Sequence, residues 1–250
     1  MTVGIVGLGL IGGSMAKSIK ARTAHTVFGC DLDQETMMMA RMCGAIDAPL
    51  TAENLKDCDL VLVAIRPAAA VKWVKEHAEG IRRDTILVDL CGVKRAVVRE
   101  LAPVAEQYGF AYIGGHPMAG RERGGFTAAT DSLYVGASMI LTQGKRTDMQ
   151  LLETLKAFFL DIGFASLTFS DPEEHDRIIA FTSQLAHMAR LDEDMWTELF
   201  LDDADYLTDE LDILIGHLQE YADALKSKDA EHLRALLRDG REKKATAGGN

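Results

Sequence analysis

The sequence has few of the features that mark secreted, membrane-spanning or metal-binding proteins. It contains only 4 cysteines among 250 residues, and no two of them are spaced as C-x-x-C. We therefore expect reduced thiols, no disulfide framework and no metal site. No apolar run approaches the ~18 residues that span a bilayer, and the N-terminus lacks the positive charge of a signal peptide. These absences predict a cytoplasmic protein with no membrane partner.

Basic residues are also scarce, because 27 Lys and Arg stand against 38 Asp and Glu, a net charge of −11. A protein that binds the phosphate backbone shows the opposite balance, so nucleic acid is excluded as a partner. Residues 171–250 supply the whole excess, and ten acids with no base lie between Asp192 and Asp212. We interpret this run as the solvated face of helices.

Apolar segments alternate with amphipathic ones over the first 170 residues. Strands are predicted at 2–6, 25–30, 59–65, 85–90, 110–113, 138–142 and 165–169, and helices at 12–20, 34–43, 67–79, 93–106 and 149–162. This alternation is typical of an α/β domain built on a doubly wound parallel sheet. After Asp171 the strand pattern stops, and apolar residues spaced by three and four from Leu207 through Tyr221 to Leu225 predict a long helix. We therefore expect an α/β domain at 1–170 and a smaller all-α domain at 171–250.

A glycine-rich turn lies between the first predicted strand and helix. It matches the dinucleotide fingerprint of a Rossmann-type domain at six positions, Gly7, Leu8, Gly9, Leu10, Ile11 and Gly12. Gly7 permits the tight turn, Gly9 lets a pyrophosphate approach the backbone, and Gly12 lets the helix pack on the strand. The pyrophosphate would then lie on the helix N-terminus.

Two further residues complete the predicted nucleotide site. Asp31 lies 19 residues past Gly12, where a carboxylate can accept bonds from ribose hydroxyls, and Ile65 ends a later apolar run. Asp33 follows closely, and no Lys or Arg lies between Asp31 and Arg41. Two acids would repel a 2′-phosphate, so we expect NAD rather than NADP as the cofactor.

A histidine flanked by glycines marks a second candidate site, in the run Gly114-Gly115-His116-Pro117. Because ligands collect at the carboxyl ends of parallel strands, His116 is placed to meet a substrate beside the nicotinamide. An imidazole with a pKa near ~6.5 can take the proton of an alcohol as its hydride leaves. From position alone, a structural histidine bonded to the backbone explains His116 equally well.

Three segments resemble the prephenate dehydrogenase family, namely residues 114–125 (GGHPMAGRERGG), 89–94 (DLCGVK) and 181–187 (FTSQLAH). The resemblance covers residues 2 to about 190 and resumes at the Met-Trp pair of residues 195–196. It implies an NAD(P)-dependent oxidative decarboxylation of prephenate, or of arogenate, in tyrosine biosynthesis. It also implies a homodimer joined through the helical domain.

The resemblance assigns roles to individual residues. His116 would bond the ring hydroxyl of the substrate and act as the base. Ser183 and His187 are four residues apart, share one helical face and would face the substrate. The remaining substrate-binding candidates are Gly92, Glu122 and Lys94, of which the two charged residues are equally well explained as solvated charges.

The sequence departs from the family in two places. Many relatives have a serine where this chain has Gly92. Only seven residues separate His187 from the Met-Trp pair, where the family usually carries a longer helical stretch with an arginine for a substrate carboxylate. Arg190 is the nearest cation that could take this role, and an Arg190→Ala variant with unchanged KM for prephenate would exclude it. The alternatives are Arg121, Arg123 or an arginine of a second subunit.

Other functions stay open on the sequence alone. A β-hydroxyacid dehydrogenase or imine reductase of the same fold would rely on a helix lysine instead of a histidine. A regulatory protein that binds a nucleotide and has lost catalysis would fit the shortened helical stretch. Prephenate and arogenate differ only by a keto against an amino group, and the sequence does not separate them.

Overall fold

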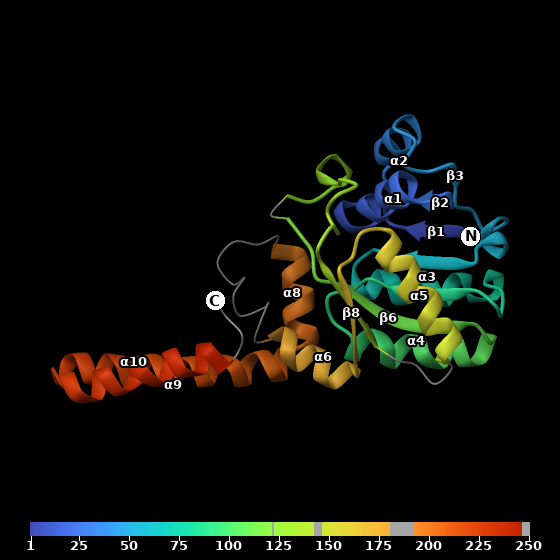
Figure 1. The fold of residues 1–250 in the computed structure, drawn as a ribbon. Helices are drawn as coiled ribbons and strands as arrows, with labels where there is room; N and C mark the ends of the chain where they lie inside the picture. Colours follow the sequence, from blue (N-terminus) through green and yellow to red (C-terminus); the bar gives the residue numbers. More distant parts are fainter. Residues whose placement is uncertain (122, 143–146, 181–192, 247–250) are drawn as a thin grey trace.

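The computed structural model describes residues 1–121, 123–142, 147–180 and 193–246. Eight strands form one sheet in the order β3-β2-β1-β4-β5-β6-β7-β8, with helices on both faces (Figure 1). Neighbouring strands are parallel except β6 and β7, which are antiparallel. The predicted doubly wound sheet is therefore confirmed, with one antiparallel pair that the apolar pattern did not reveal.

The strands are β1 (Thr2–Val6), β2 (Thr26–Cys30), β3 (Ala48–Pro49), β4 (Leu60–Val63), β5 (Ile86–Asp89), β6 (Ala111–Pro117), β7 (Ser138–Thr142) and β8 (Ser166–Ser170). The helices within this part are α1 (Leu10–Arg22), α2 (Gln34–Met42), α3 (Pro67–His77), α4 (Arg95–Tyr108) and α5 (Met149–Asp161). The later helices are α6 (Pro172–Ile179), α8 (Glu193–Asp202), α9 (Ala204–Lys226) and α10 (Ala230–Thr246).

Each central strand contributes side chains to two hydrophobic cores, one on each face of the sheet. In β4, Leu60 and Leu62 join the cluster that includes the buried faces of α1 and α5. Val61 and Val63 point to the opposite face and join the buried residues of α3 and α4. Because helices cover both faces, such strands are apolar at every position, which explains the continuous apolar runs in the sequence.

The helix that follows the last strand begins where the sequence predicts. The Asp171 side chain accepts a hydrogen bond from the backbone N–H of Glu174 at 2.9 Å, and Pro172 occupies the first helical position. An aspartate cap and a proline at this position both favour helix initiation. α6 therefore begins immediately after β8 and lies against α4 (Figure 1).

β6 is longer than predicted. The sequence predicts a strand at 110–113 followed by a turn, whereas the strand continues to Pro117. The antiparallel β7 provides the ladder partners for this extension, with His116 opposite Ile140 and Pro117 opposite Met139. His116 therefore lies at the carboxyl end of a strand and not in a flexible turn.

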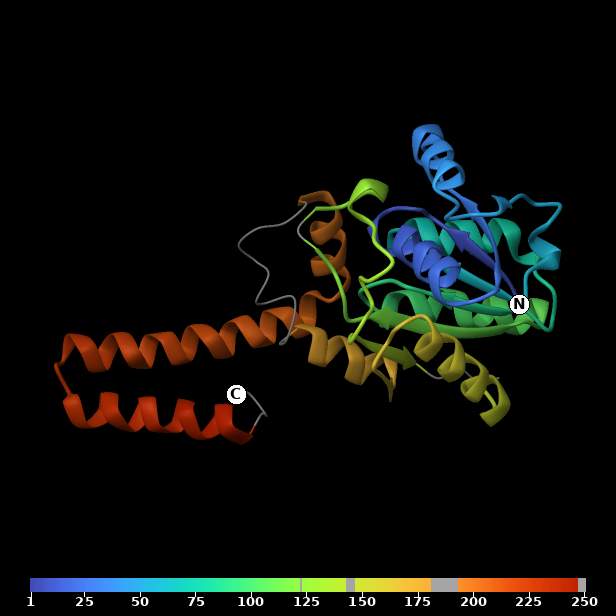
Figure 2. The same ribbon diagram turned by 45° about the horizontal axis from the view of Figure 1, so that its top comes forward.

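The helices α9 and α10 form a hairpin that projects away from the sheet (Figure 2). The predicted apolar stripe lies on α9, where Leu207 is buried. Farther along the helix the stripe is open to solvent, since Leu214, Leu218 and Leu225 are 39%, 59% and 61% exposed. Most of the stripe is therefore not part of a core formed by one chain.

Three properties concern the described part of the chain as a whole, namely the hydropathy of its helices, the grouping of its metal-ligating side chains and the state of its cysteines. Within residues 1–121, 123–142, 147–180 and 193–246, no helix is long and apolar enough to cross a membrane. Over the same residues, no group of three or more His, Cys, Asp or Glu side chains is arranged to hold a metal ion. All four cysteines lie in this part and are free thiols.

Candidate active site

The glycine turn after β1 is built around two crowded positions and one open one. Gly7 has φ +85°, and an added Cβ would lie 2.3 Å from Cγ2 of Ile65. A Cβ on Gly12 would lie 1.8 Å from the carbonyl oxygen of Gly7. A Cβ on Gly9, by contrast, would meet no atom of the described residues within 4 Å. Gly7 and Gly12 are therefore required by the fold, whereas Gly9 leaves open space at the N-terminus of α1 that an anion can approach.

Asp31 ties this turn to the end of β2. Its Oδ2 accepts a hydrogen bond from the N–H of Leu8 at 2.7 Å, and its Oδ1 accepts one from the N–H of Asp33 at 3.0 Å. The Leu8 side chain is buried in the core, while Leu10 and Ile11 are half-buried at the start of α1. A carboxylate can accept about four hydrogen bonds, so Asp31 keeps acceptor capacity for a ribose.

The order of the strands places this turn at a ligand-binding crevice. Strand order reverses between β1 and β4, and ligands of open α/β sheets bind at such points, outside the carboxyl ends of the strands. Ile65 follows β4 and lies against Gly7, so the turn and the end of β4 meet there. The predicted nucleotide residues are thus brought together at one edge of the sheet.

Two glycine variants should distinguish an effect on the stability of the fold from an effect on dinucleotide binding. Gly9→Ala adds a methyl group to open space, so we expect a wild-type melting temperature and dinucleotide affinity reduced about 10-fold or more, equivalent to ~1.4 kcal/mol. Gly12→Ala places the same group against the Gly7 carbonyl, so we expect loss of thermal stability as well. Titration calorimetry and thermal unfolding of both variants test this. Unchanged affinity in Gly9→Ala would contradict the assignment.

His116 lies on the same edge, on the third strand along the sheet from β1. The register pairs Val6 with Val63, Val63 with Asp89, and Asp89 with Gly114. These paired residues form a row across the sheet from β1 to β6, which is three strand spacings or about 15 Å long. His116 lies two residues beyond Gly114, the residue at the β6 end of this row. The imidazole and the glycine turn therefore border the same edge of the sheet.

The His116 ring is held from one side. Its Nδ1 lies 2.9 Å from Nε2 of His175, and its Nε2 faces Gly92, where an added Cβ would lie 3.9 Å away. Burial, followed by repulsion from His175 when that ring is protonated and from Lys94, holds the pKa of His116 well below 6.5. The ring is consequently a neutral imidazole at neutral pH, which is the form that accepts a proton.

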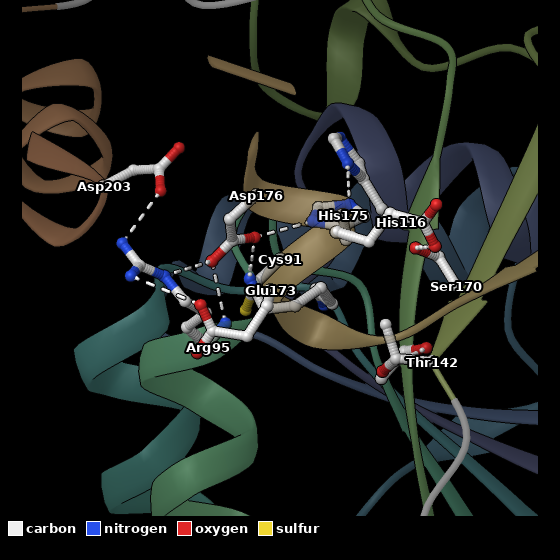
Figure 3. A network of polar contacts seen from close by, with 12 residues as sticks. Cys91, Arg95, His116, Thr142, Ser170, Glu173, His175, Asp176 and Asp203 are labelled. Carbon is white, nitrogen blue, oxygen red and sulfur yellow. Dashed lines mark hydrogen bonds and ion pairs between the residues drawn. The ribbon is translucent and has the colours of Figure 1, made fainter. Parts of the chain in front are cut away.

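His175 and Asp176 complete this arrangement (Figure 3), and the sequence analysis missed both. They lie on α6, where Nδ1 of His175 is 2.6 Å from Oδ1 of Asp176. Both side chains are fully buried. The signal that could have identified them is a polar pair on the turn before Ile179, on the face that α6 buries.

Lys94 is neither a solvated charge nor open to a ligand, which corrects the expectation from the sequence. Its ammonium is fully buried, forms an ion pair with Asp89 and donates to the carbonyl of Gly115 at 2.7 Å. Asp89 also accepts a hydrogen bond from the hydroxyl of Tyr112 at 2.8 Å. Lys94 can therefore influence a substrate only through the backbone and charges that it holds beside His116.

The acid run between Asp192 and Asp212 is not simply a solvated face. Asp203, between α8 and α9, is fully buried, and it lies 3.2 Å from the guanidinium of Arg95. Arg95 also forms an ion pair with Asp205, which lowers the pKa of Asp205 to about 2. Burial and the charge of Asp176 raise the pKa of Asp203 to about 7. Part of the run thus joins the helical hairpin to α4, a contact that no local pattern could indicate.

Several predicted substrate contacts lie outside the described residues, namely Ser183, His187, Arg190 and Glu122. Gly92 is described, and the space where its side chain would be is bordered by Leu199 of α8 at 3.6 Å. Arg121 and Arg123, the alternative cations, are both exposed. Arg121 lies 3.4 Å from the hydroxyl of Thr130.

Comparisons with known proteins identify the family of this chain. The family model described as "Prephenate dehydrogenase, nucleotide-binding domain" matches residues 15–167. Prephenate dehydrogenase from Bacillus subtilis is 28% identical over 93% of this chain and 72% of its own length.

Solved structures share the fold. The crystal structure of Aquifex aeolicus prephenate dehydrogenase superposes with a TM-score of 0.88 at 24% identity, covering 98% of this chain and 99% of that one. A second structure from A. aeolicus, in complex with hydroxyphenyl propionate and NAD+, gives a TM-score of 0.84 at 25% identity, with 99% and 98% covered. Synechocystis arogenate dehydrogenase gives 0.82 at 22% identity, with 99% and 100% covered. Because the family model matches more than half of the chain, this chain belongs to the prephenate dehydrogenase family.

Proposed function

We propose that this protein is an NAD-dependent dehydrogenase that oxidises and decarboxylates prephenate to 4-hydroxyphenylpyruvate. The observation that carries the proposal is the orientation of His116 at the edge of the nucleotide-binding sheet. His175 engages its Nδ1 at 2.9 Å, which leaves Nε2 for a substrate hydroxyl. Arogenate is the alternative substrate, and a regulatory relative without turnover is the alternative function.

The relatives support this choice of chemistry. The Bacillus subtilis relative is named a prephenate dehydrogenase, and the A. aeolicus enzyme was solved with hydroxyphenyl propionate and NAD+. That ligand carries the phenol ring and carboxylate of the product we propose. Relatives named cyclohexadienyl and arogenate dehydrogenase are the reason to test arogenate beside prephenate.

The proposed reaction needs orientation and one hydrogen-bond acceptor. Bound NAD supplies the acceptor for the hydride that leaves the ring carbon bearing the hydroxyl. His116 Nε2 accepts the hydroxyl proton in a hydrogen bond and stabilises the positive charge that develops as the hydride departs. The ring carboxylate leaves as CO₂, and its bonding electrons complete the aromatic ring. The shared proton stays with the product phenol, so no net proton is released.

The residues of the glycine turn fit a dinucleotide. Gly9 and the N-terminus of α1 would hold the pyrophosphate, and Asp31 would accept the ribose hydroxyls. The Asp33 carboxylate caps α2 by accepting from the backbone N–H groups of Glu35 and Thr36, which fixes a second negative charge beside Asp31. A 2′-phosphate would meet both carboxylates, so we expect NAD to be preferred over NADP.

The test is a fourfold assay of NADH or NADPH production, with prephenate or arogenate and with NAD or NADP. We expect turnover with prephenate and NAD, and a kcat/KM at least about 10-fold lower with NADP, since a tenfold ratio is only ~1.4 kcal/mol. Equal efficiency with both cofactors would contradict the cofactor assignment. Turnover with arogenate alone would replace the substrate, and no turnover with either would favour the regulatory alternative.

We also propose that a second copy of the chain covers the α9–α10 hairpin. The hairpin exposes a group of large apolar side chains, Ile213, Leu214, Ile215, Leu218, Leu225 and Leu237. An apolar surface rimmed by charges is typical of an interface. Light scattering should give a dimer, and Leu218→Glu should shift it towards monomer, whereas the exposed control Glu220→Gln should not. A wild-type monomer at micromolar concentration would exclude this interface.

A further inference from the structure

Hydrogen bonds lead from His116 through His175 to the carboxylate of Asp176, which the N-terminus of α4 holds in place. Oδ1 of Asp176 accepts a hydrogen bond from the backbone N–H of Lys94 at 2.7 Å, and Oδ2 accepts one from the N–H of Arg95 at 2.8 Å. These two amides are the cap and first residue of α4. The positive end of a helix stabilises a carboxylate, and the Arg95 guanidinium lies 3.6 Å from Oδ2. Asp176 is therefore an anion that can only accept hydrogen bonds.

This anion determines where the hydrogens lie on both imidazoles. Because Asp176 accepts, Nδ1 of His175 must carry the hydrogen in the 2.6 Å contact. Burial lowers the pKa of His175 and so favours its neutral form. The Nε2 of neutral His175 is an acceptor, so Nδ1 of His116 must be the donor across 2.9 Å. His116 is thereby left with an unprotonated Nε2, because the tautomer of a histidine is set by the hydrogen bond that its other nitrogen makes.

We propose that His175 and Asp176 are positioning residues for His116, which hold it in the Nδ1–H tautomer and stabilise the positive charge that the ring shares when Nε2 accepts the hydrogen bond of the substrate hydroxyl. This inference rests on the proposed function, in which His116 is the acceptor. His175 is fully buried, so it acts through His116 and not on the substrate. Asp176 supplies the negative charge at the far end, two hydrogen bonds from His116 and three from the reacting hydroxyl.

Variants of His175 distinguish its effect on the tautomer of His116 from the stabilisation of positive charge by Asp176. His175→Gln keeps a side-chain oxygen that can accept from Nδ1 of His116, but it breaks the connection to Asp176. His175→Phe removes both. His77→Phe is the control, because His77 ends α3 and contacts the carbonyl oxygen of Trp73, at the opposite end of that helix from the crevice. Asp176 itself is left unchanged because its replacement would also remove the cap of α4.

The decisive readout is the tautomer of His116, measured by ¹⁵N NMR on histidine-labelled protein without substrate. The signal is assigned by its absence in His116→Asn. We expect Nδ1 protonated and Nε2 unprotonated in the wild type and in His175→Gln, and loss of this preference in His175→Phe. A wild-type His116 protonated at Nε2 would overturn the proposal, whatever the substrate of the protein.

Kinetics provide the second readout. We expect kcat to fall about 10²-fold in His175→Phe and less in His175→Gln, with the dissociation constant for NAD unchanged. A kcat within about threefold of wild type in His175→Phe would overturn the positioning role. If that variant does not fold, a wild-type kcat in His175→Gln would overturn the stabilisation by Asp176. If no substrate is turned over but the tautomer depends on His175, the proposed function fails and the positioning of His116 stands.

Discussion

Replacing His116 by asparagine is expected to lower kcat by about 10²–10⁴-fold, the contribution of a single acid–base group. Asparagine is polar and of similar size, but it cannot take up positive charge as the hydride leaves. The dissociation constant for NAD should remain within about twofold, because the glycine turn and Asp31 lie at the other end of the row of strands. Steady-state kinetics together with NAD titration measure both quantities.

The control is His77→Asn, at the C-terminal end of α3, which should keep wild-type kinetics. The pH profile gives a further check on the same residue. Since the pKa of His116 lies well below 6.5, Nε2 stays unprotonated as the pH falls through 6.5, and kcat/KM should be lost only at lower pH. A His116→Asn variant with wild-type kcat would leave a lysine-based dehydrogenase of the same fold as the better explanation.

Replacing Lys94 by methionine is expected to destabilise the protein by about 3–5 kcal/mol, because it leaves Asp89 as an uncompensated buried charge. Both side chains of this pair are fully buried. Methionine keeps most of the volume, so the loss reflects charge and not a cavity. For a chain of this size the melting temperature should fall by roughly 6–20 °C, which thermal unfolding measures.

Two comparisons make this result interpretable. Lys75→Met breaks the pair between Lys75 and Glu100, whose side chains are 46% and 41% exposed, and should cost only about 0–1 kcal/mol. Adding Asp89→Asn to Lys94→Met should recover part of the lost stability, since the unpaired charge is removed. A Lys94→Met variant as stable as Lys75→Met would show that the buried pair does not hold this edge of the sheet together.

The nucleotide half of the site could be predicted because its signals are local. Gly7, Gly9 and Gly12 fall within one turn, and the apolar run before them identifies the strand that positions it. Asp31 directly follows the next strand, and parallel pairing of β1 with β2 brings it to the Leu8 amide. In such a motif, sequence spacing largely determines distance in space.

The residues behind His116 could not be predicted in this way. His175 is 59 residues from His116 in the sequence, and Asp176 is 82 residues from Lys94. Their contacts depend on how α6 lies against α4 and on where β6 ends. The antiparallel β7, which extends β6 to Pro117, carries the same apolar pattern as a parallel strand. For the same reason, Asp203 was indistinguishable from its solvated neighbours until its contact with Arg95 was known.

A crystal structure with NAD and hydroxyphenyl propionate would test the central claim most directly. The account predicts His116 Nε2 within about 2.6–3.2 Å of the phenolic oxygen, with Nδ1 still bonded to His175 and the ligand ring beside the nicotinamide. A phenolic oxygen bound elsewhere, with Nε2 of His116 facing protein atoms alone, would contradict the account and leave a nucleotide-binding fold without its base.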